Sequence, residues 1–298
     1  MGKIFAIALL GTGVLGSAVA RRLAERGWRV TVYNRTREKA LALLPYGVTL
    51  SDHVTEAIAV ADIILLTLAD YPATRHVLEE AAQKLSFHSK VIVQMGTISS
   101  EQSRDLQDLV QKHGGLYAEA PVLGSAPEAL AGRLLVFGGA ESTLWQKLLP
   151  LFQDLAEKPM WVGPVGKAAI VKLAFNQLIA TLTLAFATSL TLIEREGIAT
   201  ECFMELLRQS SLYAPTFDKK LPRMLHHHYE EPNFSYRHLV KDFRLFHEEL
   251  KRHPLQSEWV SCLEPFFRRW ENSSLANLDY SVLYKLIGSK EYTPGSNV

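Results

Sequence analysis

The chain has 298 residues, enough for about two domains, and its 21% of charged residues is ordinary for a folded globular protein. A net charge of +1 without a basic stripe gives no reason to expect nucleic acid or an anionic membrane as a partner. The two cysteines, Cys202 and Cys262, are far apart and lack metal-ligand spacing. They argue against a disulfide framework or a zinc site and favour a reducing compartment, the cytoplasm.

The N-terminal segment has the pattern of a strand, a glycine-rich turn, a helix and a second strand. Residues 3–10 form an apolar run of strand length, residues 14–26 an amphipathic helix, and residues 28–33 the next strand. The turn reads Gly11-Thr12-Gly13-Val14-Leu15-Gly16, a G-x-G-x-x-G pattern in the place that dinucleotide binding requires. In such a site Gly11 allows the tight turn, Gly13 lets a pyrophosphate approach the backbone, and Gly16 lets helix and strand pack closely. The alternative is that the glycines serve a turn and nothing else.

The residues after the second strand predict which dinucleotide is bound. A site specific for NAD would place an acid there, whereas this chain has Asn34-Arg35-Thr36, with Lys39 following. An arginine fork beside hydroxyl and amide donors suits a 2′-phosphate. The sequence therefore predicts NADPH, the alternative being a solvated arginine on a loop.

Strand and helix patterns then alternate as far as residue 163, which predicts an α/β, Rossmann-type, doubly wound and mostly parallel sheet. The carboxyl ends of its strands should bring several loops beside the cofactor, namely Leu68-Ala69-Asp70, Gly96-Thr97 and Leu123-Gly124-Ser125. From Gly163 onward only helical patterns follow, with breaks near Gly197, residues 213–215, residues 232–233 and Pro254. The predicted domains are an NADP-binding domain at 1–163 and an all-helical substrate and dimerisation domain at 164–298. Residues 290–298 are expected to be disordered.

One long helix is predicted to join the two domains. Residues 167–194 contain no proline or glycine and a single ionisable side chain between their ends, that of Lys172. The run is long enough to span a bilayer, but its amide and hydroxyl residues favour a helix buried in a soluble protein. Lys172, with Asn176 one turn further on, is a candidate proton donor. On these residues alone, a lysine that extends its amine to solvent is an equal alternative.

A cluster at His226-His227-His228 looks like a metal site, but three consecutive side chains cannot point at one ion. We expect a solvated run and no metal.

Taken together, these residues resemble the β-hydroxyacid dehydrogenase family over nearly the whole chain. The resemblance rests on the glycine-rich turn, on Gln94-Met95-Gly96-Thr97-Ile98, on residues 120–125, on Gly163 and Gly166 followed by Lys172 and Asn176-Gln177, and on Lys241-Asp242 and Asp279-Tyr280-Ser281. Residues 124–132 lean toward the glyoxylate/succinic semialdehyde reductase branch. The resemblance implies that Lys172 is the catalytic acid/base, that Asn176 orients the substrate, that Thr97 lies near the nicotinamide and that Lys241 contributes to the cofactor site. It also implies a substrate loop at Leu123-Gly124-Ser125 and a homodimer or homotetramer that covers the outer face of residues 173–193.

The activity implied by the resemblance is hydride transfer between NADPH and a small aldehyde, keto acid or β-hydroxyacid, with Lys172 exchanging the proton. Two positions depart from the family: Leu123 and Gly96 each stand where a serine is usual. Ser125 can replace the lost hydroxyl only if the chain turns at Gly124. An imine reductase, in which the lysine is typically replaced, and a non-catalytic NADPH-binding sensor or scaffold protein are the alternatives.

Overall fold

The computed structural model of the protein describes residues 5–288. The chain divides into two compact units, Met1–Ala174 and Phe175–Val298, and the division falls inside helix α8 (Lys167–Arg195). The sequence predicts a boundary at Gly163, where the strand patterns end. The first turn of α8 nevertheless contacts the first unit, because the backbone N–H of Ala168 donates to Glu119. Residues 3 and 4 of the first predicted strand, and the tail at 290–298, lie outside the described residues.

The first unit is organised on a sheet, with strands in the order β3-β2-β1-β4-β5-β6-β8-β7 and with β9 beside β8. Neighbours from β3 to β6 are parallel, as are β8 and β9, whereas β8 is antiparallel to β6 and to β7. The predicted doubly wound, mostly parallel sheet is thus confirmed. The strands are β1 (Ala6–Leu10), β2 (Arg29–Tyr33), β3 (Thr49–Leu50), β4 (Ile63–Leu66), β5 (Val91–Gln94), β6 (Leu116–Glu119), β7 (Val122–Leu123), β8 (Leu135–Gly139) and β9 (Met160–Gly163).

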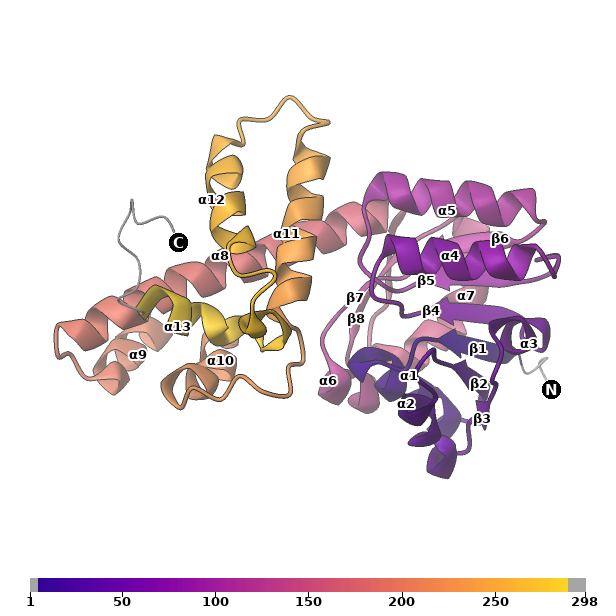
Figure 1. The fold of residues 1–298 in the computed structure, drawn as a ribbon, viewed down its shortest axis with the longest axis horizontal. Helices are drawn as coiled ribbons and strands as arrows, with labels where there is room; N and C mark the ends of the chain where they lie inside the picture. Colours follow the sequence, from indigo (N-terminus) through magenta and orange to yellow (C-terminus); the bar gives the residue numbers. More distant parts are fainter. Residues whose placement is uncertain (1–4, 289–298) are drawn as a thin grey trace. The chain divides into compact units, whose positions relative to one another are not determined.

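Both faces of this sheet are covered by helices, because the strands are apolar on both sides. Along β1, Ile7 and Leu9 enter one hydrophobic core while Ala8 and Leu10 enter the other. Figure 1 shows α4 and α5 on one face of the sheet and α1 and α2 on the other. The helices of the first core are α1 (Val14–Glu25), α2 (Arg37–Leu41), α6 (Ala126–Ala131) and α7 (Ser142–Leu155), and those of the second are α3 (Val54–Ala59), α4 (Tyr71–Ala82) and α5 (Ser100–Lys112).

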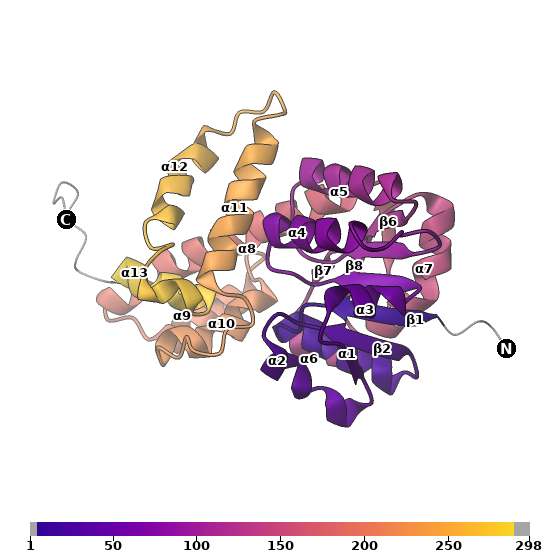
Figure 2. The same cartoon turned by 45° about the vertical axis from the view of Figure 1, so that its right-hand side comes forward.

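The second unit is helical throughout its described part. Helices α11 and α12 form a hairpin (Figure 2), whose apolar faces bury Phe243 and Phe267 against each other with ring centroids 4.6 Å apart. A second core packs Phe186 of α8 on Phe217 of α10, also at 4.6 Å. The elements after α8 are α9 (Thr200–Gln209), α10 (Pro215–Leu225), α11 (Tyr236–Leu250), α12 (Glu258–Arg268), two short 3₁₀ turns at Ser274–Asn277 and Tyr280–Val282, and α13 (Leu283–Gly288).

A buried ion pair joins α10 to the turn before α13. Lys220 Nζ lies 2.8 Å from Asp279 Oδ2, with 6% and 0% of the two side chains exposed. Burial lowers the pKa of Lys220, and the Asp279 carboxylate opposes that shift. Removing either partner alone would leave a buried charge unpaired.

The composition of α8 predicts a helix that is buried on all sides, but the structure leaves part of its surface exposed. Leu178, Leu182 and Leu192 are 48%, 38% and 59% exposed, whereas Asn176 and Thr183 are buried in the protein. Among the described helices α8 alone has the length and apolar composition of a membrane span, and 39% of its most apolar window is buried. A core helix of a soluble protein has the same length and composition.

Candidate active site

The glycine-rich turn connects β1 to α1 with the geometry that a diphosphate site needs. Gly11 has φ +102°, and a Cβ there would lie 2.8 Å from the carbonyl oxygen of Thr67. A Cβ on Gly16 would lie 2.0 Å from the carbonyl oxygen of Gly11, whereas one on Gly13 would meet nothing within 4 Å. The first turn of α1 has no acidic residue and no side-chain cap, so its N–H groups are available to an anion.

The residues between the glycines differ in exposure. Thr12 is buried, with no hydrogen-bond partner for its Oγ1 among residues 5–288, while Val14 is 53% exposed and Leu15 half-buried. Leu68 follows β4 and lies between the glycine-rich turn and the loop after β5. Its Cδ2 is 3.1 Å from a Cβ built on Gly11, and its carbonyl oxygen is 2.8 Å from a Cβ built on Gly96. Ala69 is exposed.

Asn34, the residue after β2, is hydrogen-bonded to the glycine-rich turn. Its Oδ1 accepts a hydrogen bond of 2.9 Å from the backbone N–H of Thr12, and its Nδ2 donates at 2.8 Å to the carbonyl of Thr36. Both ends of the amide are therefore engaged within the protein. Arg35 and Thr36 are exposed, which leaves the guanidinium and hydroxyl as the groups that can meet a 2′-phosphate.

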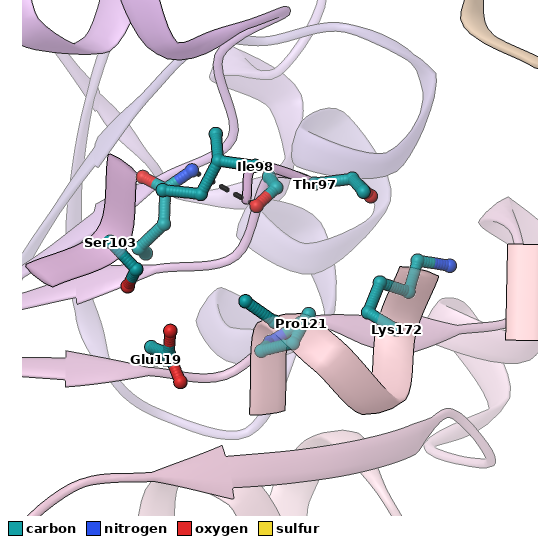
Figure 3. Close-up of a pocket in the computed structure, with 9 residues that line it drawn as sticks. Thr97, Ile98, Ser103, Glu119, Pro121 and Lys172 are labelled. Carbon is teal, nitrogen blue, oxygen red and sulfur yellow. Dashed lines mark hydrogen bonds between the residues drawn. The ribbon is translucent and has the colours of Figure 1, made fainter. Parts of the chain in front are cut away.

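A cavity of about 10 Å³ lies at the carboxyl ends of β5 and β6. The first turns of α8 close it with Ala169 and Lys172, while Gly96, Thr97 and Pro121 contribute from the strand ends. In Figure 3 the side chains of Thr97 and Lys172 point to the same side, away from Glu119 and Ser103. Lys172 is half-buried, so its stem is held in the wall while its amine is directed toward that side.

The substrate loop predicted at 123–125 continues β7 into α6. Leu123 is half-buried and pairs with Leu135 of β8, and it is not among the residues that line the cavity. The chain turns at Gly124, with φ +124°, but Ser125 then caps α6: its N–H and its hydroxyl each donate at 2.7 Å to Glu128 Oε2. The turn at Gly124 is the condition under which Ser125 can replace the missing serine hydroxyl, but the proton of that hydroxyl is directed to Glu128.

In the second unit Asn176 has a fixed orientation. Its Nδ2 donates to Asp242 Oδ2 at 2.5 Å, and both residues are buried. Since a carboxylate only accepts, the amide nitrogen must face Asp242, and Asn176 Oδ1, which has no donor among residues 5–288, must face the other way. Lys241 Nζ lies 2.9 Å from Asp242 Oδ1. Asp242 of α11 thus orients Asn176 so that its Oδ1 is the available acceptor.

Comparison with known families decides the assignment. The family described as the NAD binding domain of 6-phosphogluconate dehydrogenase matches residues 6–163, more than half of the chain. The family described as NAD-binding of NADP-dependent 3-hydroxyisobutyrate dehydrogenase matches residues 166–287. The chain belongs to the β-hydroxyacid dehydrogenase family. As a β-hydroxyacid dehydrogenase it is an NADP-dependent oxidoreductase, so the predicted family, enzyme class and cofactor are confirmed.

Relatives of this β-hydroxyacid dehydrogenase carry more than one kind of name. Glyoxylate/succinic semialdehyde reductase 1 of Arabidopsis thaliana is 26% identical over 283 residues, 94% of this chain and 98% of that one. The cytokine-like nuclear factor N-PAC of Homo sapiens is 27% identical over 241 residues, 80% of this chain but 43% of its own length. The fold is that of Mycobacterium tuberculosis 3-hydroxyisobutyrate dehydrogenase, solved with L-serine, at a TM-score of 0.85, 20% identity, and coverage of 96% of this chain and 100% of that one.

The residues of this β-hydroxyacid dehydrogenase fit the cofactor that the family implies. The backbone at Gly13 is open to an approaching group, and the neighbouring glycines leave no room for side chains that would displace it. The residues that would hold NADPH are the turn at 11–16 for the diphosphate and Arg35 with Thr36 for the 2′-phosphate. No cluster of metal-ligating residues occurs within residues 5–288.

Sequence reasoning gave no role to three polar residues, which are Gln94 and Glu119 in the first unit and Asp242 in the second. Gln94 and Glu119 line the cavity from the last positions of β5 and β6, where an apolar strand pattern conceals them. Asp242 was noted beside Lys241, but its bond to Asn176 spans 66 positions along the chain. A polar residue at the last position of an otherwise apolar parallel strand is the signal that points to the first two.

Proposed function

We propose that this protein is an NADPH-dependent reductase of a small aldehyde or keto acid, with Lys172 as the proton donor. The observation that carries the proposal is the position of Lys172: it lines a cavity at the carboxyl ends of β5 and β6, together with Thr97 of the predicted nicotinamide-side loop. Ligands bind at this edge in open parallel sheets.

In the proposed reaction, bound NADPH supplies a hydride to the carbonyl carbon of the substrate. Lys172, protonated at its Nζ, donates a hydrogen bond and then its proton to the carbonyl oxygen as negative charge develops there. Lys172 shares the cavity wall with Ala169 and Pro121, and we expect this wall to limit the directions that its amine can take. In the reverse reaction neutral Lys172 would accept the hydroxyl proton.

Asn176 follows Lys172 by four residues in the same continuous helix. Because Asp242 fixes its amide, Asn176 would present Oδ1, an acceptor, to a substrate hydroxyl or to an ammonium. Lys241 keeps its predicted place at the cofactor as a proposal, with Asp242 holding its ammonium.

The substrate class is proposed from the branch the chain leans toward, which is supported by its similarity to the Arabidopsis glyoxylate/succinic semialdehyde reductase. Leu123 removes a hydroxyl at the loop expected to bind a carboxylate, so small carboxylated aldehydes should bind weakly. A homo-oligomer that covers Leu178, Leu182 and Leu192, and a cytoplasmic location, also remain proposals. Light scattering of the purified protein tests whether it is a homo-oligomer.

A second candidate is an NADPH-binding protein without turnover. It is favoured by the similarity to N-PAC, whose name is not that of an enzyme, over 80% of this chain. The two candidates differ in one measurement, which is whether the protein oxidises NADPH when a carbonyl substrate is added.

The test is NADPH oxidation with glyoxylate, succinic semialdehyde, other small aldehydes and keto acids, and cyclic imines. The wild type should turn over at least one aldehyde or keto acid, and Lys172→Ala should lower kcat by about two to four decades, the range for a lost general acid, with NADPH binding unchanged. Lys167→Ala is the matched control, because Lys167 is an exposed lysine in the first turn of the same helix. Turnover of imines alone, or full activity in Lys172→Ala, would contradict the proposal.

A further inference from the structure

The carboxyl group of Glu119 is buried at the amino end of α8. Glu119 is the last residue of β6 and is 1% exposed. Its Oε2 accepts a hydrogen bond of 3.2 Å from the backbone N–H of Ala168. The backbone N–H groups of Gly166 and Ala169 also donate to the carboxyl. Ala168 and Ala169 lie in the first turn of α8, where backbone N–H groups have no partner within the helix, and Gly166 is the residue before it.

The surroundings leave this carboxyl little freedom. A Cβ on Gly139 would lie 2.1 Å from Glu119 Oε2, so the strand beside β6 approaches the carboxyl closely. On the cavity side, Ser103 lies near it and is hydrogen-bonded at 2.9 Å to Tyr117, which is itself buried. The carboxyl is thus confined between β8, α5 and the first turn of α8.

We propose that Glu119 is a positioning residue for Lys172: by capping the first turn of α8 it fixes where the lysine side chain leaves the helix. Ala168, which donates to the carboxyl, precedes Lys172 by four residues, one helical turn on the same face. The distance along the axis is about 6 Å at 1.5 Å per residue. This inference rests on the proposed role of Lys172 as proton donor.

Glu119 acts through the backbone and not as a charge partner of the amine. Figure 3 shows the Lys172 side chain directed away from Glu119, with Pro121 between them. Burial raises the pKa of the Glu119 carboxyl, while Ser103 and the three backbone N–H groups oppose that shift. A carboxyl that has gained a proton still offers its carbonyl oxygen to the Ala168 N–H, so the cap depends on the reach of the side chain more than on its charge.

Two substitutions separate reach from charge. Glu119→Gln keeps the length and one acceptor oxygen but removes the charge, whereas Glu119→Asp keeps the charge but is one methylene too short for Ala168. We expect Gln to retain wild-type kcat within about threefold. We expect Asp and Ala to lower kcat by about ten- to hundredfold, the usual effect of a misplaced catalytic group, with NADPH affinity unchanged.

A readout independent of turnover is hydrogen exchange of the peptide that contains residues 164–171. Loss of the cap should speed exchange there about fivefold in the Asp and Ala variants and leave the Gln variant near wild type. Asp154→Asn is the matched control: Asp154 is a largely buried carboxylate of the same unit, held by Arg26 and Trp28, and it does not line the cavity.

Each outcome decides the inference. Loss of activity and of slow exchange in Gln would show that charge matters and would overturn it, whether or not Asp retains them, as would all three variants behaving like Asp154→Asn. If the Ala variant does not fold, the comparison of Gln with Asp is sufficient. If the proposed function is wrong, the Lys172→Ala variant will show full turnover. The hydrogen-exchange measurement would then still confirm or refute the cap by Glu119.

Discussion

Two glycines of the turn between β1 and α1 should respond in opposite ways to the same added methyl group. Gly16→Ala would place a Cβ 2.0 Å from the Gly11 carbonyl oxygen, more than 1 Å inside the shortest ordinary contact, and backbone cannot rotate aside. Gly13→Ala meets nothing within 4 Å, and its φ of −70° and ψ of −172° are accessible to alanine.

The magnitudes follow from these contacts. Overpacking of a rigid site costs roughly 1–3 kcal/mol, so Gly16→Ala should lose at least that from the free energy of unfolding. Gly13→Ala should stay within about 1 kcal/mol of the wild type, since alanine restricts the unfolded chain but is a poorer N-cap. Its methyl would instead hold a diphosphate away from the backbone, and one lost charge-assisted hydrogen bond of about 1.5–3 kcal/mol weakens NADPH binding about ten- to hundredfold.

Urea unfolding measures the free energy of unfolding of both variants, and fluorescence titration of the same preparations measures their NADPH affinity. The expected pattern is a destabilised Gly16→Ala and a stable Gly13→Ala that binds NADPH weakly. A Gly13→Ala protein with wild-type NADPH affinity would refute the diphosphate site at this turn. A Gly16→Ala protein as stable as the wild type would refute the close packing.

Three further measurements address individual side chains. Arg35→Asp should weaken NADPH binding by about 2 kcal/mol or more while NADH is affected far less, and equal wild-type affinities for the two cofactors in calorimetry would contradict this. The pKa of Glu119 is raised above its ordinary 4.5, so its contribution to stability is fully present below pH 4.5 and is lost as pH rises through the folded pKa. The wild type should therefore lose stability relative to Glu119→Gln as pH increases, and a difference independent of pH would refute the shift. Leu123→Ser should raise kcat/KM for glyoxylate and succinic semialdehyde by about one neutral hydrogen bond, roughly 1 kcal/mol, and no gain with either would place the carboxylate elsewhere.

The sequence predicted the main elements well because their patterns are local. The alternation of apolar strands with helices predicted the order of elements in the first unit. The uninterrupted run from Lys167 predicted α8 to within one residue of its end at Arg195. It missed α2, β3 and α6, which have five, two and six residues, too few to establish a period. The capping pair of Ser125 and Glu128 was present in the sequence and could have indicated α6.

The site was less accessible to sequence reasoning because its contacts are non-local. Parallel strand ends predicted that Thr97 would lie at the cofactor edge, and the structure brings it to one cavity with Lys172. Nothing in the sequence pattern indicates that Glu119 caps a helix 49 positions further along, or that Asp242 orients Asn176. Contacts of this kind depend on how the elements pack, which periodicity does not record.

The close approach of Gly139 to the Glu119 carboxyl also constrains how the two positions can change during evolution. Any β-carbon at 139 would lie 2.1 Å from Glu119 Oε2 and 3.1 Å from the Ala168 side chain. The two positions are therefore coupled: a side chain at 139 requires either that the Glu119 carboxyl moves or that position 119 becomes shorter, and either change disturbs the cap on α8. We expect glutamate at 119 to occur with glycine at 139 in every relative that keeps this packing, so that the pair is inherited as one unit although 20 positions separate its members.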